Sequence, residues 1–206
     1  SGERGIFNRK AAQDLAPERR DSTYEFGVNP CSEVVLRPSG LCNLSECILR
    51  PNDSLASVAD KVAMASILGT FQSTLTNFRY VRPVWKKNAE EERLLGVSFT
   101  GVYDCPVILN ATPKQLESLR DVAIKTNKEW AERLGIEQSV AVTCIKPSGT
   151  VSQLTGVAGS GLHPAYAKYY IRRVRQDKKD PLNQALVAAG VPYVEDPYNS
   201  EAWVFS

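Results

Sequence analysis

One short segment of the chain holds a cysteine, a glutamate and a second cysteine in close succession. Cys31 and Cys42 are eleven positions apart, and Glu33 follows Cys31 by two. Side chains alternate between two faces along an extended chain, so Cys31 and Glu33 are expected to point the same way, with the Asn29 amide beside them. The segment therefore predicts a redox-capable thiol pair next to an acid–base group. The alternative is two buried cysteines that pack as small hydrophobic residues.

Prolines and a glycine should shape the backbone of this segment. Pro30 removes a backbone donor and restricts Asn29, so we expect a loop or a bent edge here and not a central strand. The sequence Pro38-Ser39-Gly40 indicates a turn that would bring Cys42 back towards Cys31.

A second candidate site is a turn of four consecutive residues, Pro147, Ser148, Gly149 and Thr150. It follows an apolar, β-rich stretch and precedes a short helix expected at 151–154, an arrangement that can bind phosphate at a helix N-terminus. Gly149 would let the backbone approach the ligand, and the hydroxyls of Ser148 and Thr150 would donate to its oxygens. Lys146 precedes the turn, so the spacing is not that of a Walker P-loop. The alternative is a plain turn.

Helices and strands should alternate around these two sites. Apolar residues at helical spacing predict a helix from Leu55 to Phe78. A capping threonine, Thr112, followed by proline and glutamine, predicts a second helix that runs to Leu134 and stops at Gly135. We expect a third helix at 181–189 and strands at 95–103, 139–145, 191–194 and 202–205. This alternation indicates an α/β fold with a parallel sheet and crossover helices.

The composition is that of a globular domain. With 206 residues, of which 43% are hydrophobic and 23% charged, the chain can bury a sizeable core, and we treat 1–206 as one domain. A net charge of +2 argues against binding to a nucleic acid polymer, and no apolar run approaches the roughly 20 residues that span a membrane. Five cysteines without a CxxC pair, and no signal peptide, favour a cytoplasmic protein. The single methionine is Met64, which favours a piece of a larger protein.

The motif Asn-Pro-Cys-Ser-Glu at 29–33, followed by Cys-Asn-Leu-Ser-Glu at 42–46, resembles the active-site loop of ribonucleotide reductases. The cysteine spacing is closest to that of the monomeric, adenosylcobalamin-dependent (class II) ribonucleoside triphosphate reductases. Further stretches resemble the same family in the same order, and the resemblance runs nearly end to end. These stretches are 1–8, 93–101 and 146–152, with 169–175 after them.

The resemblance implies a fold and a set of partners. The fold would be a ten-stranded α/β barrel with the cysteine loop at its centre, and this chain would be its C-terminal half. The N-terminal half, or a complementary subunit, would then be needed for activity. Adenosylcobalamin would be the cofactor, a ribonucleotide (a triphosphate by the cysteine spacing) the substrate, and a thioredoxin-like protein or a dithiol the reductant. No metal site is expected in the chain itself.

The resemblance also implies roles for individual residues. Cys31 would be the thiyl radical that abstracts the 3′-hydrogen of the ribose. Glu33 would be the general base at the 3′-hydroxyl, a role that suits a carboxylate whose pKa burial raises towards neutrality. Asn29 would hydrogen-bond the sugar hydroxyls, and Cys42 would be one thiol of the pair that supplies two electrons, with its partner upstream of this chain. The turn at 147–150 would hold the substrate phosphates.

Three rival functions remain open from the sequence. One is a non-catalytic nucleotide-binding or assembly module derived from a reductase. Another is a diphosphate reductase of another class, whose loop cysteines are usually further apart. The third is an ordinary thiol oxidoreductase, which would be expected to carry a CxxC motif. Cys47, Cys105 and Cys144 are expected to be structural.

Overall fold

Two parallel strands, β3 (Asn43–Ile48) and β4 (Leu95–Thr100), form the centre of the region that carries both candidate motifs. The segment 139–145 runs along the second edge of β4, where Val97 N donates to the carbonyl oxygen of Val142 over 2.9 Å. This segment forms only an isolated parallel bridge and no regular strand, so the strand predicted there is present in an irregular form. Among residues 5–206, which the computed structural model describes, no strand pairs with the outer edge of β3.

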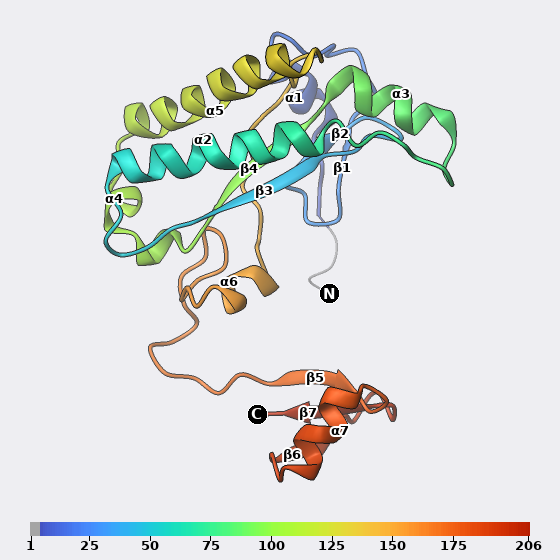
Figure 1. The fold of residues 1–206 in the computed structure, drawn as a ribbon, viewed down its shortest axis with the longest axis vertical. Coiled ribbons are helices and arrows are strands. Elements are labelled where there is room, and N and C mark those ends of the chain that lie inside the picture. The colour runs from blue at the N-terminus through green and yellow to red at the C-terminus, as the bar shows by residue number, and fades with distance from the viewer. Residues whose placement is uncertain (1–4) are drawn as a thin grey trace. The chain divides into compact units, whose positions relative to one another are not determined.

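Two long helices cover one face of this sheet (Figure 1). Helix α2 (Leu55–Gln72) connects β3 to β4 together with α3 (Pro83–Glu92), and α5 (Pro113–Leu134) packs beside α2. The predicted boundaries of α5 are confirmed, including a reciprocal capping box at its start and a left-handed Gly135 at its end. Helix α2 ends before the predicted Phe78, because beyond the buried Ser73 the chain is mostly exposed, with Leu75 at 71%, and no core contact supports a further turn.

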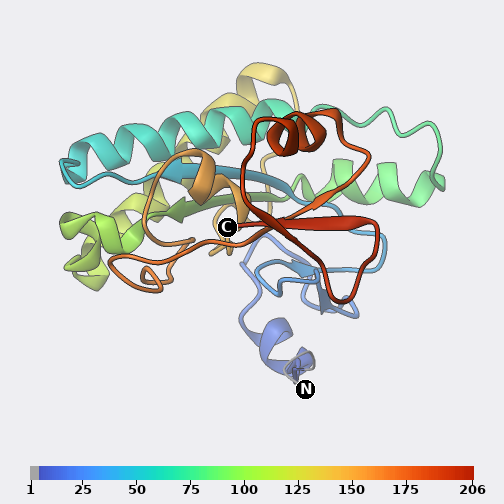
Figure 2. The same ribbon diagram turned by 90° about the horizontal axis from the view of Figure 1, so that it is seen from below.

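The core lies between the sheet and these helices. From β3, Cys47 and the following Leu49 are buried against α2 and α5, and the Ser45 hydroxyl donates to the Ala65 carbonyl of α2 over 3.0 Å. Since side chains alternate along a strand, the even-numbered residues of β3, and Cys42 just before it, face the opposite side of the sheet. Figures 1 and 2 together place the short helix α6 (Thr150–Leu154) on that opposite side.

Smaller elements complete the first of two compact units, which ends at Ala165. A hairpin of β1 (Gly27–Val28) and β2 (Val35–Leu36) carries the cysteine loop. The remaining elements of this unit are α1 (Arg9–Asp14), η1 (Val102–Asp104) and α4 (Pro106–Leu109). The first four residues of the stretch 1–8, which carries part of the resemblance, lie outside the described residues.

The second unit, Tyr166–Ser206, is a small antiparallel sheet with one helix. Its strands occur in the order β5–β7–β6, and α7 lies between β5 and β6 in the sequence. The predicted helix and the two predicted strands are confirmed, whereas the expectation of a parallel sheet does not hold for this unit or for the β1–β2 hairpin. The bounds are β5 Val174–Asp177, α7 Pro181–Ala188, β6 Tyr193–Glu195 and β7 Ala202–Phe205.

Within residues 5–206, every helix is too short or too polar to cross a lipid bilayer.

Candidate functional site

The cysteine loop is a tight turn at the tip of the β1–β2 hairpin. Asn29 closes it, because its side-chain Oδ1 accepts from Val34 N over 3.0 Å and its carbonyl accepts from Ser32 N over 2.9 Å. Ser32 adopts a left-handed backbone with φ of 64°. The predicted extended geometry is therefore wrong, and Cys31 and Glu33 do not alternate along a strand. Cys31 is exposed, whereas the Glu33 side chain is only 1% exposed.

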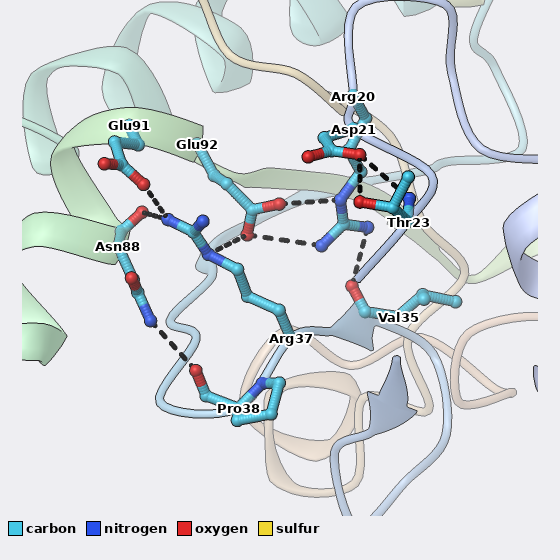
Figure 3. A network of polar contacts seen from close by, with 9 residues as sticks. All are labelled: Arg20, Asp21, Thr23, Val35, Arg37, Pro38, Asn88, Glu91 and Glu92. Atoms are coloured by element: carbon cyan, nitrogen blue, oxygen red, sulfur yellow. Dashed lines mark hydrogen bonds and ion pairs between the residues drawn. The ribbon is translucent and has the colours of Figure 1, made fainter. Parts of the chain in front are cut away.

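A buried ion network fixes this hairpin to the end of α3 (Figure 3). Arg20 Nε donates to Glu92 Oε1 over 2.8 Å, and Arg20 Nη1 donates to the Val35 carbonyl over 2.9 Å. Arg37 Nε lies 3.5 Å from Glu92 Oε2, and Arg37 Nη2 donates to Glu91 over 2.6 Å. The side chains of Arg20, Arg37 and Glu92 are all 5% exposed or less. Residues on both sides of the loop are thus held by one buried carboxylate.

An ion pair joins the cysteine loop to the second motif. Lys146 Nζ donates to Glu33 Oε1 over 3.0 Å, and Lys146 N donates to the Ser98 hydroxyl of β4 over 2.8 Å. Burial of Glu33 opposes its ionisation, but the hydrogen bond from Lys146, helped by the Asn29 amide, outweighs it and holds the pKa of Glu33 below its ordinary value. The expectation that burial would raise the pKa of Glu33 towards neutrality is therefore wrong. The same hydrogen bond raises the pKa of Lys146, and the nearby Cys31 adds to that effect.

Two thiols lie close to Gly96 on the face of the sheet opposite α2 and α5, which we call the open face. A Cβ atom added to Gly96 would lie 2.4 Å from Leu44 Cδ2, 2.9 Å from Cys144 Sγ and 3.3 Å from Cys42 Sγ, so a larger residue would displace the Leu44 side chain and crowd both sulfurs. Burial raises the pKa of Cys42 to about 12, and the neighbouring Cys144 and Glu33 add to the shift. Burial likewise raises the pKa of Cys144 to about 11. Both groups are therefore protonated thiols at neutral pH.

The second motif forms the predicted turn and short helix. Gly149 has a positive φ of 44°, and α6 begins at Thr150. The Ser148 hydroxyl is buried and lies 2.6 Å from the Thr100 hydroxyl of β4 and 3.2 Å from that of Ser160. Ser148 thus fixes the turn to the sheet, whereas Pro147, Gly149 and Thr150 are exposed.

The structure brings together most of the residues that the sequence singled out. Glu33 and Cys42 are neighbours, and Cys31 is near Lys146, which links the loop to the turn at 147–150. Sequence reasoning missed the role of Lys146 as the partner of Glu33. Cys47 and Cys105 are buried in the core as expected, but the sulfur of Cys144 lies beside Cys42 on the open face.

The signals for the missed residues were weak. Lys146 directly precedes the turn, and Cys144 lies two residues before Lys146, the spacing that places both on one face of an extended segment. No cluster of three or more His, Cys, Asp or Glu side chains in residues 5–206 is arranged to hold a metal ion.

Comparison with known proteins places the chain beside one family of reductases. It is 29% identical to the adenosylcobalamin-dependent ribonucleoside-triphosphate reductase of Levilactobacillus brevis, over 97% of this chain and 30% of that protein. It is 27% identical to the enzyme of the same name from Lactobacillus leichmannii, over 96% of this chain and 31% of that protein. No protein-family model matches the chain.

A solved structure agrees with these relatives. The crystal structure of a B-12 dependent (class II) ribonucleotide reductase matches 94% of this chain and 29% of its own chain, with a TM-score of 0.66 and 24% identity. This likeness supports the mixed α/β fold. The chain spans about 30% of the length of the curated relatives it matches. The resemblance predicted from the motifs is confirmed, and the chain corresponds to part of a larger protein.

Proposed function

We propose that this chain is a part of the catalytic domain of an adenosylcobalamin-dependent ribonucleoside-triphosphate reductase. The complete protein would reduce ribonucleotides to 2′-deoxyribonucleotides for DNA synthesis in the cytoplasm. One observation carries the proposal: the ion pair between Glu33 and Lys146 brings the cysteine loop against the 147–150 turn, although 113 positions separate the two residues. A sugar next to the thiols and a phosphate at the turn would then belong to one substrate.

The loop residues would act on the ribose. Cys31, as a thiyl radical, takes the hydrogen from the 3′ carbon, and its exposure at the hairpin tip makes it accessible to a radical source. Adenosylcobalamin, when bound, supplies that radical. Glu33 takes the proton of the 3′-hydroxyl, and its low pKa keeps it in the ionised form that accepts a proton. Asn29 positions the sugar hydroxyls. We assign no cobalamin contacts to residues of this chain.

Cys42 would be one of the two thiols that supply electrons. A donor of hydrogen must be protonated, and the raised pKa of Cys42 keeps its thiol in that form. Its partner would be a cysteine from the upstream part of the protein. A dithiol or a thioredoxin-like protein would then reduce the disulfide.

The turn at 147–150 would hold the phosphates of the substrate. Gly149 lets the main chain approach the ligand, and Thr150 is exposed at the start of α6. Ser148 fixes the turn to β4 through its hydrogen bond with the Thr100 hydroxyl, and Pro147 restricts the backbone at the start of the turn.

The sheet would form part of a ten-stranded α/β barrel in the complete protein. Its open face would line the centre of the barrel, and α2 and α5 would lie outside. The N-terminal half would supply the strands that pair beyond β3.

The test is ribonucleoside triphosphate reduction with adenosylcobalamin and a dithiol. We expect no product with this chain alone, and product when the missing N-terminal half is added. Cys31→Ser in the complete protein should abolish reduction while nucleotide still binds. Associated halves that bind nucleotide without any turnover would contradict the proposal and favour a nucleotide-binding module. Residual reduction by Cys31→Ser would contradict the radical role.

A further inference from the structure

Ser160 lies in a glycine-rich segment that has no role in the scheme above. The segment covers 156–161, with glycines at its first, fourth and sixth positions. A Cβ atom added to Gly161 would lie 2.5 Å from the Lys146 carbonyl oxygen, and Gly161 has a positive φ of 57°. Only glycine therefore allows the segment to pack this closely against the start of the 147–150 turn. This packing brings Ser160 beside that turn.

The Ser160 hydroxyl is the outer member of a chain of three hydroxyl groups. Ser160 Oγ accepts from Gly149 N over 3.0 Å and lies 3.2 Å from Ser148 Oγ. Ser148 Oγ lies 2.6 Å from Thr100 Oγ1, which accepts from Gly161 N over 2.9 Å. Thr100 is fully buried, Ser148 is buried, and Ser160 is partly exposed. The chain therefore runs from the interior, at the end of β4, to the surface of the turn.

The direction of the hydrogen bonds in this chain follows from a count of donors and acceptors. Each hydroxyl group has one hydrogen to donate and two lone pairs that accept. Thr100 accepts from Gly161 N, and within residues 5–206 its remaining hydrogen-bond partner is the Ser148 hydroxyl. A buried hydroxyl hydrogen without an acceptor costs free energy, so Thr100 donates to Ser148. Ser148 then donates its own hydrogen to Ser160.

The hydrogen of the Ser160 hydroxyl is the free donor at the end of the chain. Ser160 accepts from both Ser148 and Gly149 N, so both of its lone pairs are used. In the part of the chain that the structure describes, its own hydrogen has no acceptor. Hydroxyl groups linked in this way polarise one another, which strengthens the last donor. A ligand atom here must accept without donating, as the oxygens of an ionised phosphate do.

We propose that Ser160 is a further phosphate ligand, which donates its hydroxyl hydrogen to an oxygen of the substrate phosphates at the 147–150 turn. The inference rests on the proposed function and adds a binding residue to it. The exposed hydroxyl of Thr150, at the start of α6, is the neighbouring donor. Thr100 and Ser148 are positioning residues in this arrangement, because their hydrogens are used inside the chain. Ser160 thereby makes the contact that the sequence assigned to the Ser148 hydroxyl.

The first arm of the test is an NMR titration of the 206-residue chain with inorganic triphosphate. We expect the amide signals of Gly149, Ser160 and Gly161 to shift together, with one dissociation constant. Shifts confined to other parts of the chain, or no shifts at all, would overturn the proposal. This measurement uses the unsubstituted chain, so it decides even if a variant fails to fold.

The second arm compares variants in the same titration. Ser160→Ala removes the last donor and should weaken triphosphate binding roughly 10–100-fold, the usual effect of losing a hydrogen bond to a charged group. Ser160→Thr keeps the hydroxyl and should restore most of the affinity. Ser118→Ala, an exposed serine of α5, is the control and should bind as the unsubstituted chain does. Unchanged affinity in Ser160→Ala, or equal losses in Ser160→Ala and Ser160→Thr, would overturn the role of the hydroxyl.

The third arm uses the complete reductase. Ser160→Ala should raise the KM for the ribonucleoside triphosphate more than it lowers kcat, because Ser160 contacts a part of the substrate that does not react. A loss in kcat with an unchanged KM would overturn the role of Ser160 and leave the proposed function standing. An unsubstituted enzyme that binds triphosphate through Ser160 but reduces no ribonucleotide would overturn the proposed function alone.

Discussion

At the scale of single residues, Lys146 controls the charge of Glu33. Without Lys146 the burial of Glu33 would dominate and its pKa would rise. We expect Lys146→Met to move the acid limb of the kcat/KM profile of the complete enzyme to higher pH. The exposed Lys128→Met serves as the control. An unmoved acid limb would contradict the ion pair.

Glu33 should also link pH to folding. A folded-state pKa below the unfolded value means that ionised Glu33 stabilises the fold above the ordinary glutamate range, and that this contribution is lost as the pH falls through the lowered pKa. Glu33→Gln should remove this part of the pH dependence in urea unfolding. In the complete enzyme it should also slow reduction roughly 10²–10⁴-fold, the usual effect of losing a general base. A near-normal rate would make Glu33 structural.

The cysteines should differ in reactivity towards iodoacetamide. Cys31 is exposed, whereas burial raises the pKa of Cys42 to about 12. Because the thiolate is the nucleophile, we expect Cys31 to be alkylated first at pH 8, and the rate at Cys42 to keep rising up to strongly alkaline pH. Peptide mass spectrometry measures both sites in one sample. Fast alkylation of Cys42 at pH 8 would contradict its buried environment.

Most of the candidate site residues could be predicted from the sequence, but the contacts between them could not. Cys31, Glu33 and Cys42 lie close together in a recognisable motif. The contact of Glu33 with Lys146 joins distant positions, which no local pattern encodes. The left-handed Ser32 also escaped prediction, because alternation of side chains holds only while the chain stays extended.

At the scale of elements, Glu92 at the end of α3 holds the cysteine hairpin. Glu92→Gln would leave Arg20 and Arg37 buried with less opposite charge. The free energy of unfolding should fall by about 3–5 kcal/mol, as for a broken buried ion pair. Urea denaturation measures this loss. The exposed control Glu129→Gln should change stability by less than about 0.5 kcal/mol. A small effect of Glu92→Gln would mean that the hairpin is held elsewhere.

Helix ends show which signals a sequence carries by itself. The start of α5 at Thr112–Gln115 and its stop at Gly135 depend on local hydrogen bonds and backbone preference, so both were predictable. The end of α2 was not, because the apolar pattern continues to Leu75, which is 71% exposed. The segment 139–145 has the composition of a strand, but its regularity depends on partners that composition does not reveal.

At the scale of the whole molecule, the division at Ala165 was not predicted. Gly161 and Pro164 lie just before that point, but similar turn residues occur at several other places in the chain and did not distinguish it as a boundary. Tyr166 and Tyr169 beside it are 91% and 84% exposed. We expect brief chymotrypsin treatment to cut here first and to leave the first unit intact, as judged by mass spectrometry. First cuts inside α2 or α5 would contradict the division.

The outer edge of β3 has a consequence for how the isolated chain behaves in a test tube. A row of main-chain N–H and C=O groups without strand partners is a template for any extended peptide. Purified alone, the chain should self-associate at high concentration. A synthetic peptide that pairs with this edge should prevent self-association of the chain. Light scattering with and without added peptides would therefore screen for the segment that pairs with β3 in the complete protein.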